Sequence, residues 1–103
     1  MIVKLNKEHS KIAYLEYLLG GNSKLETIVS NCLDSLWNNN YNEYNYKNYL
    51  DDLRDNVDYP LYRDIVDVIY SIMELKPLQI ELTTENKEIL TKIKCKDNFL
   101  LFM

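Results

Sequence analysis

Two stretches of the sequence place apolar residues three and four positions apart, and this spacing constrains the fold more than any other feature. The first covers residues 23–37, where the apolar positions follow one side of a helix. The second covers residues 59–75 and stops before Pro77, because the residue before a proline disfavours the helical conformation. We therefore predict two long amphipathic helices, the second of them at the centre of the core. Their apolar positions are Leu25, Ile28, Val29, Cys32, Leu33 and Leu36 in the first, and Leu61, Ile65, Val68, Ile69, Ile72 and Leu75 in the second.

The N-terminal part of the chain has two shorter elements. Residues 1–6 have the composition of a strand, and residues 7–19 keep the apolar spacing of a helix. Gly20-Gly21 marks the end of this helix, since glycine readily adopts the left-handed backbone that follows many last helical turns. We expect a strand followed by a helix that ends at these glycines.

The middle of the chain combines a helix start with an Asn- and Tyr-rich segment. The spacing of Ser23 and Glu26 predicts a capping box, in which each side chain binds a backbone N–H near the other. Asn competes with helix formation by bonding its own backbone, so we predict a loop in the first half of residues 38–48. Helical spacing resumes at Tyr46 and predicts a modest helix up to about Asp55.

The segment from residue 78 to residue 103 admits two interpretations. Apolar and polar residues alternate over residues 78–82, which predicts a strand. We prefer a meander in which residues 89–95 form a second strand and residues 99–103 a third. The alternative caps a short helix at Thr84 and keeps only the terminal strand. In both cases the fold class is α+β. About four helices pack on a small, mostly antiparallel sheet that the C-terminal strands form, and the N-terminal strand is a candidate for the same sheet.

Length and composition indicate one globular domain over residues 1–103. The hydrophobic fraction of 47% is ordinary for a folded domain, and the chain is too short to divide into two useful cores. No apolar run is long enough to span a bilayer, and the first residues lack the pattern of a secretory signal. We therefore expect a cytoplasmic protein with no membrane partner. Cys32 and Cys95 are far apart in the sequence and are expected to be two reduced, buried thiols.

Residues that carry catalysis are scarce. The one histidine, His9, falls in the first turn of a predicted helix and is typical of a solvated surface residue. Both glycines follow a helix, so the glycine-rich loops that bind phosphates are absent from the sequence. The aspartates from Asp51 to Asp58 lack the alternating order of a calcium loop. We expect no enzyme activity, no cofactor and no metal.

Charge is distributed unevenly along the chain. The sequence carries 16 acidic and 12 basic residues, a net charge of −4. Nine acidic and three basic residues fall between Asp34 and Leu75, which gives this part a net charge of −6. Binding to nucleic acid depends on Lys and Arg that release counterions from phosphates, so we expect no nucleic-acid partner. A basic protein, such as a toxin or a nuclease, suits this surface better.

The same acidic part holds Trp37 and seven of the nine tyrosines. Trp and Tyr offer rigid contact area and are common at binding hot spots, while carboxylates steer a basic partner. The alternative is that several tyrosines belong to the core, because Tyr46 and Tyr49 share the spacing of the leucines that follow them. The candidate partner-binding residues are Asp34, Trp37, Tyr41, Tyr44, Asp51, Asp52, Asp55, Asp58 and Tyr59.

An acidic, aromatic and non-catalytic domain fits an inhibitor or immunity protein that covers a basic partner. Residues 33–37, Leu-Asp-Ser-Leu-Trp, and residues 57–61, Val-Asp-Tyr-Pro-Leu, resemble stretches of the ribonuclease inhibitor barstar. The separation of the two matches is longer here than in that family, and no residue role is transferred. Two other functions stay open: a phage or mobile-element antagonist that mimics nucleic acid, and a small assembly or adaptor subunit whose oligomeric state is unknown.

Overall fold

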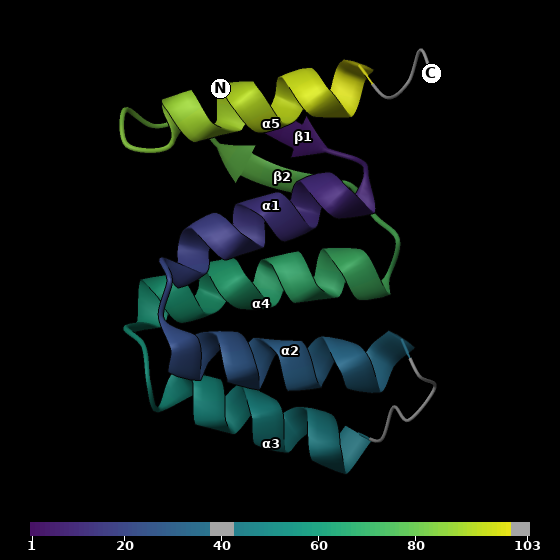
Figure 1. The fold of residues 1–103 in the computed structure, drawn as a ribbon, viewed down its shortest axis with the longest axis vertical. Coiled ribbons are helices and arrows are strands. Elements are labelled where there is room, and N and C mark those ends of the chain that lie inside the picture. The colour runs from purple at the N-terminus through teal and green to yellow at the C-terminus, as the bar shows by residue number, and fades with distance from the viewer. Residues whose placement is uncertain (38–42, 100–103) are drawn as a thin grey trace.

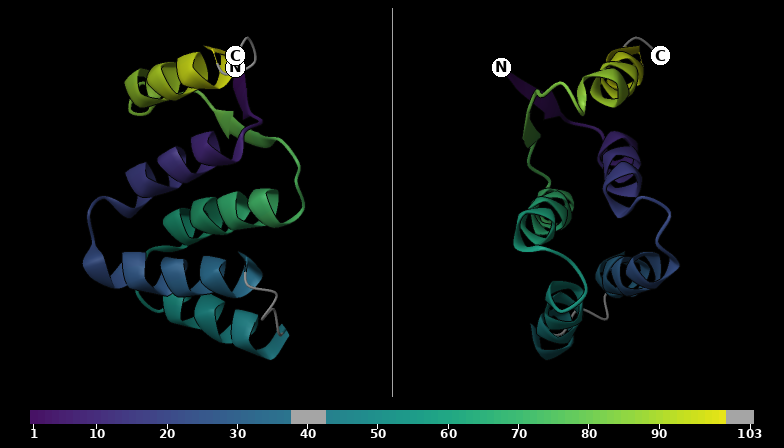
Figure 2. Two further views of the ribbon diagram at one scale, coloured as in Figure 1. Left: turned by 45° about the vertical axis from the view of Figure 1, so that its right-hand side comes forward. Right: turned by 90° about the vertical axis from the view of Figure 1, so that its left-hand side faces the viewer.

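The described chain forms five helices and two strands, which are stacked along the long axis of the molecule (Figure 1). The computed structural model describes residues 1–37 and 43–99. One layer holds α1, α2 and α5, and the other holds the two-stranded sheet, α3 and α4 (Figure 2). The α+β fold class is therefore confirmed. The elements are β1 (Ile2–Leu5), α1 (Glu8–Leu19), α2 (Ser23–Trp37), α3 (Glu43–Arg54), α4 (Tyr59–Met73), β2 (Leu78–Glu81) and α5 (Lys87–Phe99).

The sheet consists of β1 and β2 in antiparallel register. Ile2 lies opposite Glu81 at one end, and Leu5 lies opposite Leu78 at the other. Side chains alternate between the two faces of a strand, so Leu78 and Ile80 turn into the core while Gln79 and Glu81 stay exposed. The N-terminal strand thus belongs to the sheet, as its composition suggested.

Helix α4 is the central helix of the core, which confirms the expectation from its apolar spacing. It packs against α1, α3 and β2. Ile65 and Val68 are completely buried, and Ile69 and Ile72 are nearly so. Burying a side chain of this size stabilises the fold by about 1.5–3 kcal/mol, so this face of α4 fixes the position of its opposite, polar face. None of the described helices is both long and apolar enough to cross a membrane.

The preferred C-terminal meander is wrong, because residues 87–99 form helix α5. Thr83 and Asn86 bond each other's backbone N–H through Oδ1 of Asn86 and Oγ1 of Thr83, at 2.8 and 3.2 Å. This exchange closes the turn before the helix and favours a helical start. Leu90 and Ile93, three residues apart, then face the core, whereas Thr91 is exposed. The expected third strand falls largely on residues 100–103, which lie outside the described residues.

Three further expectations need correction. The cap of α2 is Asn22, whose Oδ1 accepts the N–H groups of Lys24 and Leu25, so the capping box predicted at Ser23 does not form. Helix α3 begins earlier than predicted, at Glu43. Cys32 is buried as expected, but Cys95 is exposed, because α5 turns it away from the core.

A buried lysine ties the end of α4 to α1. Lys11 is 3% exposed, and its ammonium donates to the carbonyl oxygens of Ser71 and Lys76, at 2.9 and 2.6 Å. These carbonyls belong to the C-terminal end of α4 and to the turn that follows it, where a cation is favoured by the helix dipole. Leu75, in the same turn, has the left-handed φ of 57°. The contact fixes where β2 begins relative to α4.

Candidate functional site

The structure divides the sequence-predicted binding residues into two groups. Asp34 and Trp37 lie in the last turns of α2, whereas Asp52 lies in the last turn of the antiparallel helix α3 and Asp55 directly follows this helix (Figure 1). A helix of 15 residues is about 20 Å long, so the two groups cannot meet at one contact point. Trp37 instead reaches α1, where its indole N–H donates to the carboxylate of Glu8 at 3.2 Å.

The second group surrounds the turn between α3 and α4. Asp55 and Asp58 line a shallow hollow beside the α1–α2 turn, and Tyr59 is 65% exposed at the start of α4. Asp51 is half-buried and pairs with Arg54 at 3.5 Å. These side chains form an exposed acidic rim without a deep cavity. Tyr41 lies outside the described residues, as does the side chain of Tyr44, whose backbone belongs to α3.

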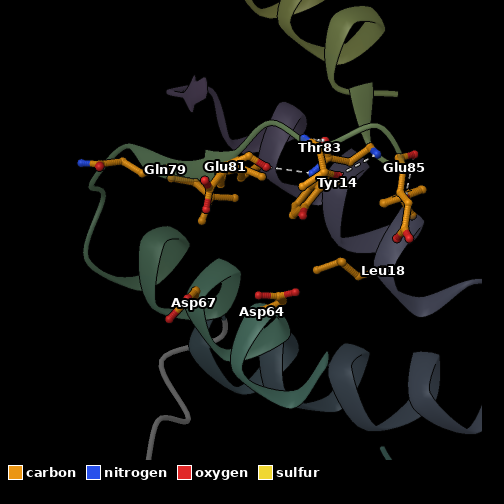
Figure 3. A pocket seen from close by; sticks show the side chains of 12 residues that line it. Tyr14, Leu18, Asp64, Asp67, Gln79, Glu81, Thr83 and Glu85 are labelled. Carbon is orange, nitrogen blue, oxygen red and sulfur yellow. Dashed lines mark hydrogen bonds between the residues drawn. The ribbon is translucent and has the colours of Figure 1, made fainter. Parts of the chain in front are cut away.

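A deeper acidic site lies between α4 and β2 (Figure 3). Its cavity has a volume of about 360 Å³. Asp64 and Asp67 stand on the α4 side, and Glu81 and Glu85 come from β2 and the loop after it. None of the described residues that line the cavity is basic. We call this site the acidic groove. Its polar and aromatic lining includes Asp64, Asp67, Gln79, Glu81, Glu85, Tyr14 and Tyr17.

Two tyrosines of α1 form the floor of the acidic groove. The ring centroids of Tyr14 and Tyr17 are 5.9 Å apart, with a tilt of 31°. Tyr14 is buried, whereas Tyr17 is 40% exposed and its hydroxyl donates to the carbonyl oxygen of Glu85 at 3.5 Å. The three-residue spacing of the pair on α1 places both rings on one side of the helix. The groove therefore offers an aromatic surface beneath its carboxylates.

Asn86 connects the loop before α5 to the β2 side of the groove. It is buried, and its side-chain N–H donates to the carbonyl oxygen of Glu81 at 3.0 Å. Its side chain also bonds the backbone N–H of Thr83 at 2.8 Å. A buried side chain with these partners is held in one orientation, so the residues around it are preorganised.

The electrostatics of the groove favour a positive ligand. Burial raises the pKa of the Asp64 carboxyl, the charge of Asp67 raises it further, and Arg63 partly opposes them. Burial also raises the pKa of Tyr14 to about 12, with additional contributions from Asp64 and Tyr17 and an opposing hydrogen bond from Asn86. Both shifts mean that further negative charge is unfavourable here. A cation placed in the groove would relieve this repulsion.

The groove carries groups that can bind a cation. Carboxylates and tyrosine faces accept ammonium and guanidinium groups through charge-assisted hydrogen bonds and cation–π contacts. Among the described residues, no group of three His, Cys, Asp or Glu side chains is placed to hold a metal ion. The arrangement suits the Lys or Arg side chains of another molecule.

Sequence reasoning missed the groove because its residues come from three separate segments. Asp64 and Asp67 were counted in the acidic middle of the chain but not singled out, although their three-residue spacing puts both on one side of α4. Glu81 and Glu85 lie beyond that middle part, in a segment with no excess of acid. The three-residue spacing of Tyr14 and Tyr17 was the available signal for the floor.

The segments that resemble barstar lie at the end of α2 and at the start of α4. No protein-family model, curated protein or solved structure matches the chain.

Proposed function

We propose that this chain is a non-catalytic inhibitor or immunity protein that neutralises a basic protein, such as a toxin or a nuclease, in the cytoplasm. The observation that carries the proposal is the acidic groove, where four carboxylates and no described basic residue line a cavity floored by tyrosines. An inhibitor needs a surface that binds a positive partner tightly, and clefts of one charge sign raise association rates. Carboxylates gathered around a cavity suit protruding Lys or Arg side chains better than they suit a mimic of nucleic acid.

The groove also has the two components expected of a binding hot spot. Tyr14 and Tyr17 supply aromatic contact area, and the carboxylates of the groove supply charge that selects against acidic partners. The acidic rim on α3 and at the start of α4 would add long-range attraction, since exposed charges act over about 10 Å at moderate salt. In this proposal the groove determines affinity and the rim contributes to the association rate.

The test is capture of a partner by two variants that lose the same number of charges. The groove variant carries Asp64→Asn, Asp67→Asn, Glu81→Gln and Glu85→Gln. The control carries Asp34→Asn, Asp51→Asn, Asp52→Asn and Asp55→Asn. Each is immobilised and mixed, at low salt, with cell extract and with the products of neighbouring genes. The catalytic activity of any protein released by raised salt is then titrated with the wild-type chain.

The proposal requires that the wild-type chain and the control capture a basic protein and inhibit it, while the groove variant captures much less. If the control loses capture instead, the partner binds the exposed acidic rim, and the proposal that it binds the groove is wrong. If the captured protein stays fully active when saturated with this chain, the inhibitor function is wrong.

A further inference from the structure

The outer edge of β2 opens onto the acidic groove. Four consecutive residues of β2, from Leu78 to Glu81, line the cavity, and no residue of β1 does so. Side chains on one face of a strand would contribute every second residue. A cavity that touches each residue in turn therefore runs along the edge of the strand, between β2 and α4 (Figure 3).

The backbone groups on this edge can be assigned from the register. The N–H of Leu82 donates to the carbonyl oxygen of Met1 at 2.9 Å, so these two residues form a hydrogen-bonded pair. Such pairs alternate along an antiparallel ladder, which makes Ile80 and Leu78 the next residues bonded to β1. The N–H and C=O groups of Gln79 and Glu81 consequently point away from β1.

Part of this outward edge is already used. The carbonyl oxygen of Glu81 accepts from the side chain of Asn86, which confirms that it faces away from β1. Among the described residues, none outside β1 bonds the N–H or C=O of Gln79 or the N–H of Glu81. An edge strand with such groups is a template for a further strand.

The space beside the edge continues past the cavity. A second hollow, of about 310 Å³, shares Asp67, Leu78 and Gln79 with the first and extends toward Tyr70 and Pro77. The two hollows together follow the length of β2. An extended segment could therefore lie along the whole strand.

We infer that an extended, basic segment of the partner adds to β2 as a third strand and places its Lys or Arg side chains against Asp64, Asp67 and Glu81. This inference rests on the proposed function and specifies how the partner is recognised. Strand addition obtains affinity from main-chain hydrogen bonds and specificity from side chains. Charge complementarity selects the occupant: a second copy of this chain would bring Glu81 against an equally acidic edge, which is repulsive.

The experiment uses three synthetic eight-residue peptides and the isotope-labelled full chain. The first peptide alternates Lys and Thr, the second has the same sequence with N-methyl groups on every second amide, and the third replaces each Lys by Glu. Binding is followed by NMR, and amide hydrogen exchange is measured at saturating peptide and low salt. Leu78 and Ile80 serve as internal controls, because their N–H groups already bond β1.

Strand addition predicts that the Lys-Thr peptide slows exchange at the amides of Gln79 and Glu81 by about tenfold or more and leaves Leu78 and Ile80 little changed. N-methylation should weaken binding by about tenfold or more, since two or three hydrogen bonds are lost, and the Glu-Thr peptide should not bind.

Equal binding of the methylated peptide, or no protection at Gln79 and Glu81, would overturn strand addition and leave the groove as a surface for cations. No binding of the Lys-Thr peptide at low salt would also overturn it. In both cases the inhibitor function is judged separately, by capture of the folded partner.

Discussion

At the scale of single residues, two positions break the usual preferences of side chains. Lys11 is almost completely buried although lysine is rarely found inside proteins. Leu75 has a left-handed backbone and a side chain that is 88% exposed, an unusual combination for a branched apolar residue. Leu75 lies in the turn that leads from α4 into β2, and Lys11 of α1 bonds two carbonyl oxygens of the same junction.

Replacing Lys11 by Met should destabilise the protein strongly. The substitution keeps the apolar stem but leaves the carbonyl oxygens of Ser71 and Lys76 without their ammonium donor. Losing these bonds at a buried position should lower the free energy of unfolding by about 2–4 kcal/mol, measured by urea denaturation. Lys24→Met, at an exposed position of α2, is the matched control and should have little effect. Similar free energies of unfolding for the two variants would show that the buried contact of Lys11 contributes nothing to stability.

Replacing Leu75 by Gly should stabilise the protein. A left-handed residue with a Cβ atom costs about 1 kcal/mol relative to Gly, and the exposed side chain of Leu75 has little contact to lose. The melting temperature should therefore rise. Leu75→Ala removes the same side chain but keeps Cβ, so it should leave stability nearly unchanged. A fall in stability for the Gly variant would mean that the leucine side chain makes a contact worth more than the strain.

At the scale of elements, the sequence predicted each helix whose apolar residues recur regularly and failed where two patterns overlap. The bounds of α2 were predicted at both ends, although the capping box that marked its start at Ser23 does not form. In α5, Ile89, Thr91, Ile93 and Cys95 also fit the alternation of a strand. A short segment with few apolar residues can satisfy both the two-residue period of a strand and the 3.6-residue period of a helix. The turn at Thr83 and Asn86 decides between them, and its exchange of hydrogen bonds appears only in three dimensions.

Replacing Asn86 by Ala should loosen both the start of α5 and the groove. The change removes the acceptor for the N–H of Thr83 and the donor to Glu81, at a buried position. We expect a loss of about 2 kcal/mol in the free energy of unfolding and faster hydrogen exchange in the first turn of α5. Asn31→Ala, at an exposed position of α2, should be neutral. If the two variants had the same free energy of unfolding and the same exchange rates, the turn at Thr83 and Asn86 would not be what stabilises the start of α5.

At the scale of the whole molecule, the sequence indicated an excess of acid in the middle of the chain but not where its carboxylates meet others in space. An excess of acid can be counted along a chain, and the excess between Asp34 and Leu75 includes Asp64 and Asp67. Their partners Glu81 and Glu85 join them because β2 folds back beside α4, and a count along the chain cannot contain that information. Trp37 and Asp55, both candidate binding residues from the sequence, are separated by the length of α2. Long-range contacts thus define the site.

The charge concentrated in the groove should reduce stability, and Asp64→Asn measures this cost. Burial and Asp67 raise the pKa of Asp64, so the folded protein holds this proton more tightly than the unfolded chain does. Its ionisation therefore lowers the free energy of unfolding as the pH rises through the raised pKa. The Asn variant should be more stable than the wild type at neutral pH, and the difference should disappear below the ordinary pKa of aspartate.

Urea denaturation of both proteins over a pH series checks this prediction, because titration of the other carboxyls cancels in the difference. Glu88→Gln is the control: it removes one negative charge from the first turn of α5, where Glu88 faces Lys92 at 3.6 Å, and should lower stability slightly at neutral pH. A groove maintained for binding keeps repulsive charges that a purely structural surface would lose. An Asp64→Asn variant no more stable than the wild type at neutral pH would remove this argument for a cationic ligand.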